Sequence, residues 1–352
     1  RTSNISKILN MSRKESSYNI RHGLILIGIA IFFAFSFMAG KSKEVEVYNR
    51  GEAHVAAVVE GEYFEPAPEH IATPPAVRGV YMSSWVAGTP TIREELLNFV
   101  NDSEINAVMI DIKDYTGKIS FHVTDPVIAE MGTEEERIRD ISALIKYLHS
   151  RKIYVIGRVS VFQDPFVAKR VPKLAVADKR GGVWKDNKGL SFIDPAAPLY
   201  WDYIVRIARE SEHLGFDEIN FDYIRYPSDG PIQYMTFPYA KDRPKPEVIE
   251  SFFKYLRTEL KDLPVPISAD LFGLTTWATD DLNIGQELER AAPYFDYIAP
   301  MTYPSHYGAG FEGFKNPAEH PYEIMKLSVD RGKERLEKMG EDPQKLRPWI
   351  QD

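Results

Sequence analysis

Residues 215–227 read GFDEINFDYIRYP. Within this stretch, residues 218–222 form a short strand-like run in which Asn220 and Asp222 share one face and apolar residues occupy the other. The preceding segment, 198–214, has helical periodicity, begins with a proline and ends just before Gly215, as helices commonly do. A helix followed by a strand with polar residues at its end is the repeating unit of a parallel α/β sheet.

The same alternation continues outward in both directions from this unit. We predict seven strands, at Gly79–Ser83, Ala107–Ile112, Tyr154–Val159, Glu218–Asp222, Pro266–Leu271, Tyr297–Met301 and Arg347–Ile350. The helices predicted between them span Ile92–Asn101, Ile138–Arg151, Pro198–Leu214, Pro246–Leu260, Ile284–Ala292 and Pro321–Met339. This order of elements indicates a parallel sheet.

Two arrangements produce such a sheet, an open doubly wound sheet and a closed barrel. No glycine-rich phosphate-binding loop follows the first strand, whereas polar residues lie at the ends of many strands. The sequence therefore favours a (β/α)8 TIM barrel over residues 77–352. Because only seven strands are found, we expect this barrel to be truncated after its seventh strand.

The N-terminal part of the chain has a different character. Residues 23–40, GLILIGIAIFFAFSFMAG, carry no charge and follow a basic segment, residues 1–22. This pattern predicts a transmembrane signal anchor with the basic segment in the cytoplasm, or a signal peptide if it is cleaved. Residues 41–76, which end in several prolines, are expected to form a stalk. The barrel would then be membrane-anchored and extracytoplasmic, or secreted after cleavage.

Composition excludes several functions. The chain has 352 residues, a formal net charge of −8 and no cysteine. The acidic balance argues against a nucleic-acid partner, and the lack of cysteine excludes disulfides and thiolate sites. Neither an HExxH nor a GxSxG pattern occurs, so the sequence indicates no metal, no cofactor and no serine nucleophile.

Side-chain parity identifies candidate catalytic residues. Asp222 and Asp270 are expected to end neighbouring strands, which lie about 4.8 Å apart. Two carboxyls that close suit a retaining glycosidase, with Asp222 as the nucleophile and Asp270 as the acid. Asp111, near the end of the second strand, is a third candidate and would act as the base in an inverting variant.

Polar and aromatic residues near the predicted strand ends, or in long loops, are candidates for substrate contact. They are Arg158, Arg225, Tyr303, Tyr226, Lys113, His306, Trp85, Trp184 and Trp277. Each also has a structural interpretation. The two arginines could form salt bridges with Asp222, Lys113 could pair with Asp111, and the aromatic rings could pack against the barrel rim.

Several motifs in their expected order resemble one known family. Besides residues 215–227, these are RGVYMSSW at 78–85, AVMIDIKDYTG at 107–117 and YIAPMTYPSHY at 297–307. Together they are similar to bacterial TIM-barrel domains of uncharacterised activity that are labelled as glycosyl hydrolases. The resemblance implies a barrel and a glycosidase-like cleft.

A wider likeness is to family 18 chitinases. Asp217, Asn220 and Asp222 match the first three positions of their fourth-strand motif, but Ile224 stands where their catalytic glutamate is expected. Asp222 instead resembles the strand-four nucleophile of amylase-like barrels, and Asp270 matches the position of their strand-five acid.

The sequence thus predicts a retaining O-glycosidase acting on an extracellular or cell-envelope polysaccharide. Two alternatives remain open. One is a catalytically inactive carbohydrate-binding or scaffold barrel, and the other is a different envelope hydrolase such as a metal-dependent deacetylase.

Overall fold

The computed structural model describes residues 68–351. The predicted cytoplasmic segment, the predicted membrane anchor at 23–40 and most of the predicted stalk lie outside these residues. None of the helices within the described part of the chain is long and apolar enough to cross a membrane.

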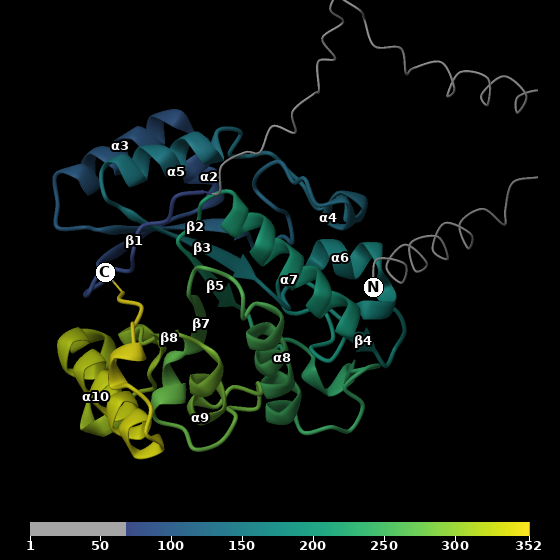
Figure 1. Ribbon diagram of the computed structural model, residues 1–352. Helices are drawn as coiled ribbons and strands as arrows, with labels where there is room; N and C mark the ends of the chain where they lie inside the picture. The colour runs from purple at the N-terminus through teal and green to yellow at the C-terminus, as the bar shows by residue number, and fades with distance from the viewer. Residues whose placement is uncertain (1–67, 352) are drawn as a thin grey trace, which may run out of the picture. The chain divides into compact units, whose positions relative to one another are not determined.

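Six parallel strands form the main sheet, in the order β1-β2-β3-β5-β7-β8. Figure 1 shows them running through the middle of the domain with helices outside them. Their bounds are Gly79–Met82 for β1, Ala107–Lys113 for β2, Tyr154–Ser160 for β3, Glu218–Asp222 for β5, Ile267–Phe272 for β7 and Tyr297–Met301 for β8. Each predicted strand up to the sixth is therefore confirmed to within one residue at every end.

Nine α-helices lie among the described residues. They are α2 (Ser84–Gly88), α3 (Pro90–Asn101), α4 (Pro126–Met131), α5 (Ile141–Ser150), α6 (Pro165–Arg170), α7 (Pro198–His213), α8 (Lys245–Glu259), α9 (Leu288–Ala291) and α10 (Pro321–Met339). Short strands β4 (Ala177–Asp178) and β6 (Met235–Thr236) pair antiparallel outside the main sheet. As predicted, Pro198 begins α7, and Gly215 follows its end with a φ of +105°.

One predicted helix begins later than expected. The span Ile284–Ala292 is helical only over α9 and the short 3₁₀ turn that follows it. Leu282 and Asn283 both have left-handed backbone conformations, and Gly285 has a φ of +84°. A run of positive φ values cannot continue a right-handed helix, so the chain makes an Asp281-capped turn there instead.

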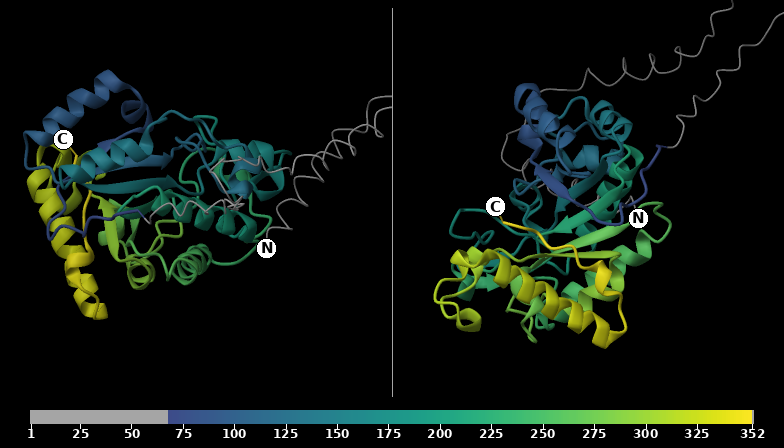
Figure 2. Two further views of the ribbon diagram at one scale, coloured as in Figure 1. Left: turned by 45° about the horizontal axis from the view of Figure 1, so that its top comes forward. Right: turned by 90° about the vertical axis from the view of Figure 1, so that its left-hand side faces the viewer.

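The predicted seventh strand is present only as two parallel bridges to β8, at Ile298↔Leu346 and Met301↔Trp349. Within residues 68–351 no strand pairing joins this segment to β1. The sheet nevertheless curls enough to bring the two edges together, because the rings of Tyr81 and Trp349 meet edge to face at 6.1 Å. Figure 2 shows this curl from two further directions. The described residues thus form a curled parallel half-barrel.

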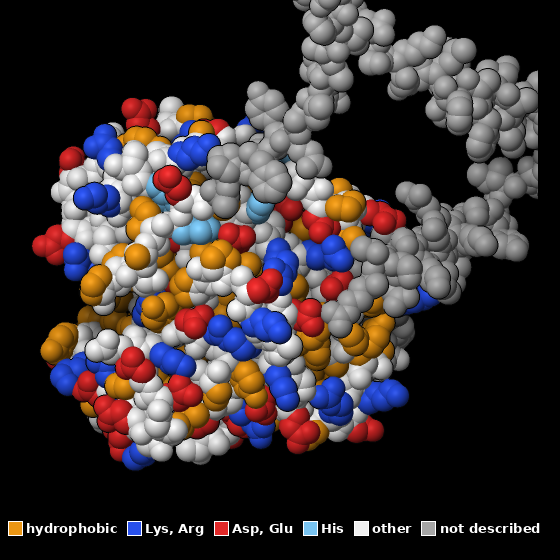
Figure 3. Space-filling model, viewed as in Figure 1, with side chains coloured by type: hydrophobic (Ala, Val, Ile, Leu, Met, Phe, Trp, Pro, Cys, Tyr) orange, Lys and Arg blue, Asp and Glu red, His pale blue; other side chains and the backbone are white. Residues whose placement is uncertain are grey.

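Alternation along the strands separates two environments. On β2, Val108, Ile110 and Ile112 face the surrounding helices and belong to the main hydrophobic core. The other parity faces the inside of the curl, where Met109, Ile156, Asn220, Ser268 and Ala299 line a cavity of about 610 Å³ between β1 and Arg347–Ile350. Figure 3 shows a hollow with hydrophobic side chains at the left edge of the surface, on the side where these edges lie in Figure 1.

Candidate active site

The inward-facing residues at the carboxyl ends of four adjacent strands are charged. They are Asp111 on β2, Arg158 on β3, Asp222 on β5 and Asp270 on β7. Each lies two residues after the residue of its strand that lines the cavity. Strand pairing places Asp111 directly opposite Arg158 and Asn220 directly opposite Ser268. The sheet therefore brings together the three aspartates that the sequence predicted as catalytic candidates.

Arg158 connects the three carboxyls. Its Nη1 donates to Asp111 Oδ1 at 2.8 Å, and its Nε donates to Asp222 Oδ2 at 3.1 Å, with Nη2 donating to the same oxygen. Asp270 Oδ2 lies 3.7 Å from the same Nε. Burial opposes the charge of Arg158, but the three carboxylates outweigh it and raise its pKa well above the ordinary value. The guanidinium is therefore a fixed cation around which the site is built.

Asp222 is held as a hydrogen-bond acceptor on both oxygens. Oδ2 receives Arg158, and Oδ1 accepts the backbone N–H of Tyr223 at 2.5 Å. Tyr223 has a φ of +53°, which is rare for a residue with a side chain and is found where the surrounding structure enforces it. The chain therefore holds an unusual backbone conformation directly after the Asp222 carboxylate.

Asp270 is buried, with a side chain 1% exposed. Burial first, and then the charge of Asp222, raise its pKa to about 8. Its Oδ1 accepts hydrogen bonds from Asn220 Nδ2 at 3.0 Å and from Trp349 Nε1 at 2.9 Å. Because Oδ1 of Asp270 already accepts two hydrogen bonds, the proton of the neutral acid belongs on Oδ2. Oδ2 is the oxygen of Asp270 that lies near Arg158.

Asp111 differs from the other two carboxyls because the oxygen that does not bind Arg158 accepts a hydrogen bond from a tyrosine hydroxyl. Tyr81 Oη donates to Asp111 Oδ2 at 2.5 Å. Burial raises the pKa of Asp111, while the charge of Arg158 acts in the opposite direction. The site also includes Tyr303, whose pKa is raised to about 12 by burial and by the charges of Asp270 and Asp222. His306 is exposed, and its ring packs edge-on against that of Tyr303 at 5.3 Å.

Three of the predicted substrate contacts lie elsewhere. Lys113 is fully buried, bonded to Ser160 O at 2.6 Å and paired with Asp164 at 3.0 Å, so it is not the partner of Asp111. A bulge in β2 between Asp111 and Lys113 separates the two side chains. Trp184 is also fully buried, with its indole N–H on Pro231 O. Tyr226 is 1% exposed and packs edge-on against Phe237. The structure thus gives each of the three residues partners outside the charged cluster.

The other two predicted substrate-contact tryptophans lie at the surface or pack locally. Trp85 is 58% exposed, and the guanidinium of Arg137 lies 4.3 Å from its ring centre. Trp277 donates to Ser328 Oγ at 3.0 Å and packs edge-on against Phe311. In the part of the chain that the structure describes, neither forms a hydrogen bond or ring contact with the charged cluster.

Sequence reasoning missed three residues that touch the cluster, namely Tyr81, Tyr223 and Trp349. Tyr81 and Trp349 come from the first strand and from the last segment, so their approach depends on the curl of the sheet. Strand parity could have identified Tyr81, because Tyr81 pairs with Met109, which faces the inside of the curl.

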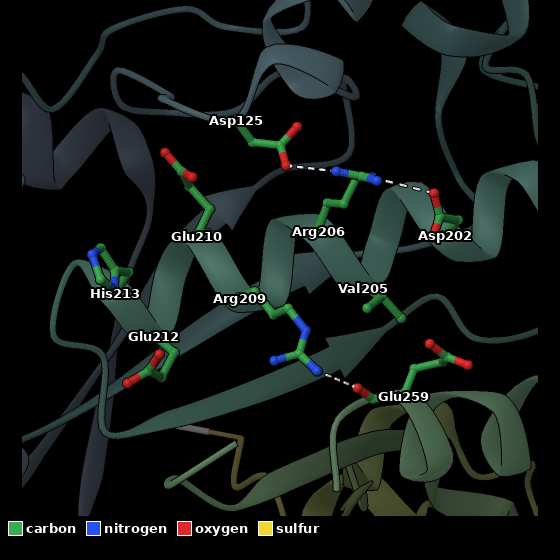
Figure 4. Close-up of a pocket in the computed structure, with 9 residues that line it drawn as sticks. All are labelled: Asp125, Asp202, Val205, Arg206, Arg209, Glu210, Glu212, His213 and Glu259. Carbon is green, nitrogen blue, oxygen red and sulfur yellow. Dashed lines mark hydrogen bonds and ion pairs between the residues drawn. The ribbon is translucent and has the colours of Figure 1, made fainter. Parts of the chain in front are cut away.

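A second hollow, of about 460 Å³, runs along α7 and contains none of these residues. Figure 4 shows that its two arginines bind neighbouring groups of the protein. Arg206 lies between Asp125 and Asp202, and Arg209 donates to the Glu259 carbonyl. The only group of potential metal ligands among residues 68–351 is His122, Glu134 and Glu136, which is also outside the cluster. The charged cluster is thus the candidate active site.

The indole of Trp349 gives a first prediction. Its N–H stabilises the ionised form of Asp270, so Trp349→Phe should raise the pKa of Asp270 further above about 8. A lost hydrogen bond of about 1 kcal/mol corresponds to roughly 0.7 of a pH unit. The measurement is a ¹³C NMR titration of the Asp270 carboxyl. Trp201→Phe is the matched control, because that indole donates to Pro195 O instead. An unchanged or lower pKa in Trp349→Phe would refute the assigned contact.

Comparisons with known proteins concern the fold and the family of the chain. A hypothetical protein from Ruminiclostridium thermocellum is 35% identical, with a TM-score of 0.49 over 54% of this chain and 96% of that chain. The glycoside hydrolase domain of PgaB (BpsB) from Bordetella bronchiseptica is 14% identical, with a TM-score of 0.50 over 76% of this chain and 82% of that domain. The second likeness shows a shared fold.

A chitobiase from Flavobacterium johnsoniae is 12% identical, with a TM-score of 0.46, and matches 73% of this chain but only 37% of its own. This chain therefore spans well under half of that enzyme. No curated protein gives a significant match. Residues 79–352 match the model of the family described as "Putative glycosyl hydrolase domain". Since this match covers most of the chain, the protein belongs to that family.

Proposed function

We propose that this protein is a retaining O-glycosidase that acts on an extracellular or cell-envelope polysaccharide. The observation that carries the proposal is the pair formed by Asp222 and Asp270 on neighbouring strands, both within ion-pair range of one Arg158 nitrogen. One carboxyl is charged and bonded to the guanidinium, and the other is buried with its pKa raised to about 8. A retaining glycosidase needs one carboxylate and one carboxylic acid separated by about 5 Å.

The proposed reaction has two steps. Asp270 Oδ2 gives its proton to the glycosidic oxygen, the bond from that oxygen to the anomeric carbon breaks, and Asp222 forms a bond to that carbon. Water then attacks the same carbon, Asp270 takes a proton from this water, and Asp222 leaves as a carboxylate. Arg158 stays charged throughout and compensates the negative charge that returns to Asp222. Tyr303 would orient the sugar hydroxyls, since the charges of both aspartates act on its own hydroxyl.

One observation favours the alternative of a catalytically inactive carbohydrate-binding barrel. Asp222 already accepts hydrogen bonds from Arg158 and from the Tyr223 N–H, and a carboxylate bonded this way is a weaker nucleophile. In addition, Ile224 is fully buried, so no side chain there replaces the glutamate of chitinase-like barrels. An inverting reaction with Asp111 as the base is a further variant. However, both oxygens of Asp111 already accept hydrogen bonds, one from Tyr81 and one from Arg158.

We also propose that the fold belongs to the (β/α)8 barrel class and that residues 23–40 anchor it to a membrane with the barrel on the extracytoplasmic side. The uncharged run and the basic residues before it support this proposal. Protease treatment of intact cells and of opened cells, followed by detection of the barrel, tests the side of the membrane on which it lies.

The test of function is the release of reducing ends from a panel of bacterial and plant polysaccharides. Release is expected for at least one polymer, and ¹H NMR of the first product should show the anomer of the substrate. The opposite anomer would favour the inverting variant. Binding without release, measured on the same panel, would support the inactive barrel. Loss of activity with a chelator would instead support metal-dependent chemistry.

A further inference from the structure

Arg225 is a buried cation that has no counter-ion among the described residues. It is 9% exposed, yet within residues 68–351 no carboxylate lies within ion-pair distance of it. Burial lowers its pKa, and Asp222, Asp229 and Asp186 act on it only through space. A buried charge without a partner is costly, so native proteins seldom keep one unless it has a function.

Two aromatic rings fix the position of this guanidinium. Its centre lies 5.2 Å from the ring centre of Tyr223 and 4.7 Å from that of Phe272. These rings follow β5 and end β7, the strands that carry Asp222 and Asp270. Arg225 is therefore held at the same edge of the sheet as the two candidate catalytic carboxyls.

The hydrogen bonds of Arg225 leave one side of the fork available. Nη1 donates to the Tyr226 carbonyl at 3.0 Å and to Ser228 Oγ at 3.3 Å. Nε and Nη2 have no hydrogen-bond acceptor among the described residues, and neither is a fully buried nitrogen that lacks a partner. A stacked guanidinium with two free donors on one side has the geometry that binds a carboxylate with two parallel hydrogen bonds.

We propose that the substrate is an acidic polysaccharide and that Arg225 binds the carboxylate of a sugar held against Asp222 and Asp270. This inference rests on the proposed function, because it takes the charged cluster as the place where the sugar lies. Arg158, which is paired with Asp222, offsets part of the repulsion between the sugar carboxylate and Asp222. A neutral sugar would leave the Arg225 charge buried and unpaired, which disfavours its binding.

The test measures binding rather than turnover, so that its failure can be told from failure of the proposed hydrolysis. Asp222→Asn protein is titrated calorimetrically with oligosaccharides of hyaluronan, alginate and polygalacturonate, and with the carboxyl-reduced form of each. We expect at least one acidic ligand to bind about tenfold or more tightly than its reduced form. Equal or tighter binding of the reduced forms, or no binding of any acidic member, would overturn the proposal.

Variants then assign the preference to Arg225. Arg225→Met in the Asp222→Asn background should abolish the acidic preference, and Arg225→Lys should keep part of it. Arg180→Met is the control, because that arginine also stacks on a ring but already pairs with Asp178. If Arg225 served only to hold Tyr226 and Ser228, its loss would weaken acidic and neutral ligands equally. Ser228→Ala covers the case in which Arg225→Met does not fold, and it should retain the acidic preference.

Discussion

Asp222→Asn is expected to lower the rate of glycoside hydrolysis by about a thousandfold or more, with little change in substrate affinity. Asparagine keeps the shape of the side chain and the acceptor for the Tyr223 N–H, but it cannot form the bond to the anomeric carbon. The loss should therefore appear in kcat and not in the dissociation constant. The measurements are reducing-end release and calorimetric titration with the substrate that the panel identifies.

Two further variants separate a nucleophile from a structural aspartate. Asp102→Asn is the matched control, because Asp102 is exposed at the end of α3, and it should keep full activity. Asp222→Ala removes the side chain, and added azide should restore part of its turnover by taking the nucleophile's place. Retention of more than a tenth of the wild-type rate in Asp222→Asn would exclude Asp222 as the nucleophile.

Arg158→Met is expected to lower the free energy of unfolding by about 3–5 kcal/mol at pH 7, because it leaves buried carboxylates without their cation. Arg158 pairs with Asp111 and Asp222 and lies near Asp270, and all three carboxyls are less than a tenth exposed. Urea denaturation of the two proteins gives the difference.

The sign of the pH dependence follows from the carboxyls. Without Arg158, protonation removes the unpaired charges, so the deficit of Arg158→Met should shrink as the pH falls from 7 toward 4. Arg180→Met, at an exposed ion pair, should cost little at either pH. A loss for Arg158→Met no larger than that control would show that the cluster is not held together by this guanidinium.

Strand positions and most of the charged cluster could be predicted from the sequence, because both follow from a period of two. Parity placed Asp111, Asp222 and Asp270 on the inner face, and Arg158 was predicted near the end of its strand. The structure agrees, because these side chains are bonded to one another. Local pattern is sufficient where the strand is regular.

The positions of the other site residues could not be predicted, because they depend on features that the local sequence pattern does not contain. The bulge in β2 breaks the parity between Asp111 and Lys113, which is why Lys113 pairs with Asp164 instead. Trp184 lies in a long loop but is buried, because β4 and β6 pair there and Phe192 packs against its ring. Trp349 reaches Asp270 only because the last segment returns alongside β8. Each of these contacts is set by tertiary structure.

The pairing of a charged Asp222 with a protonated Asp270 on one guanidinium is tested most directly by a ¹³C NMR titration of aspartate-labelled protein, with Asp270→Asn identifying the Asp270 signal. Burial and the neighbouring charge of Asp222 predict that Asp270 titrates at about pH 8, so that it carries a proton at neutral pH. Titration near pH 4, as for an ordinary aspartate, would contradict the proposed mechanism, because the site would then hold no acid to protonate the glycosidic oxygen.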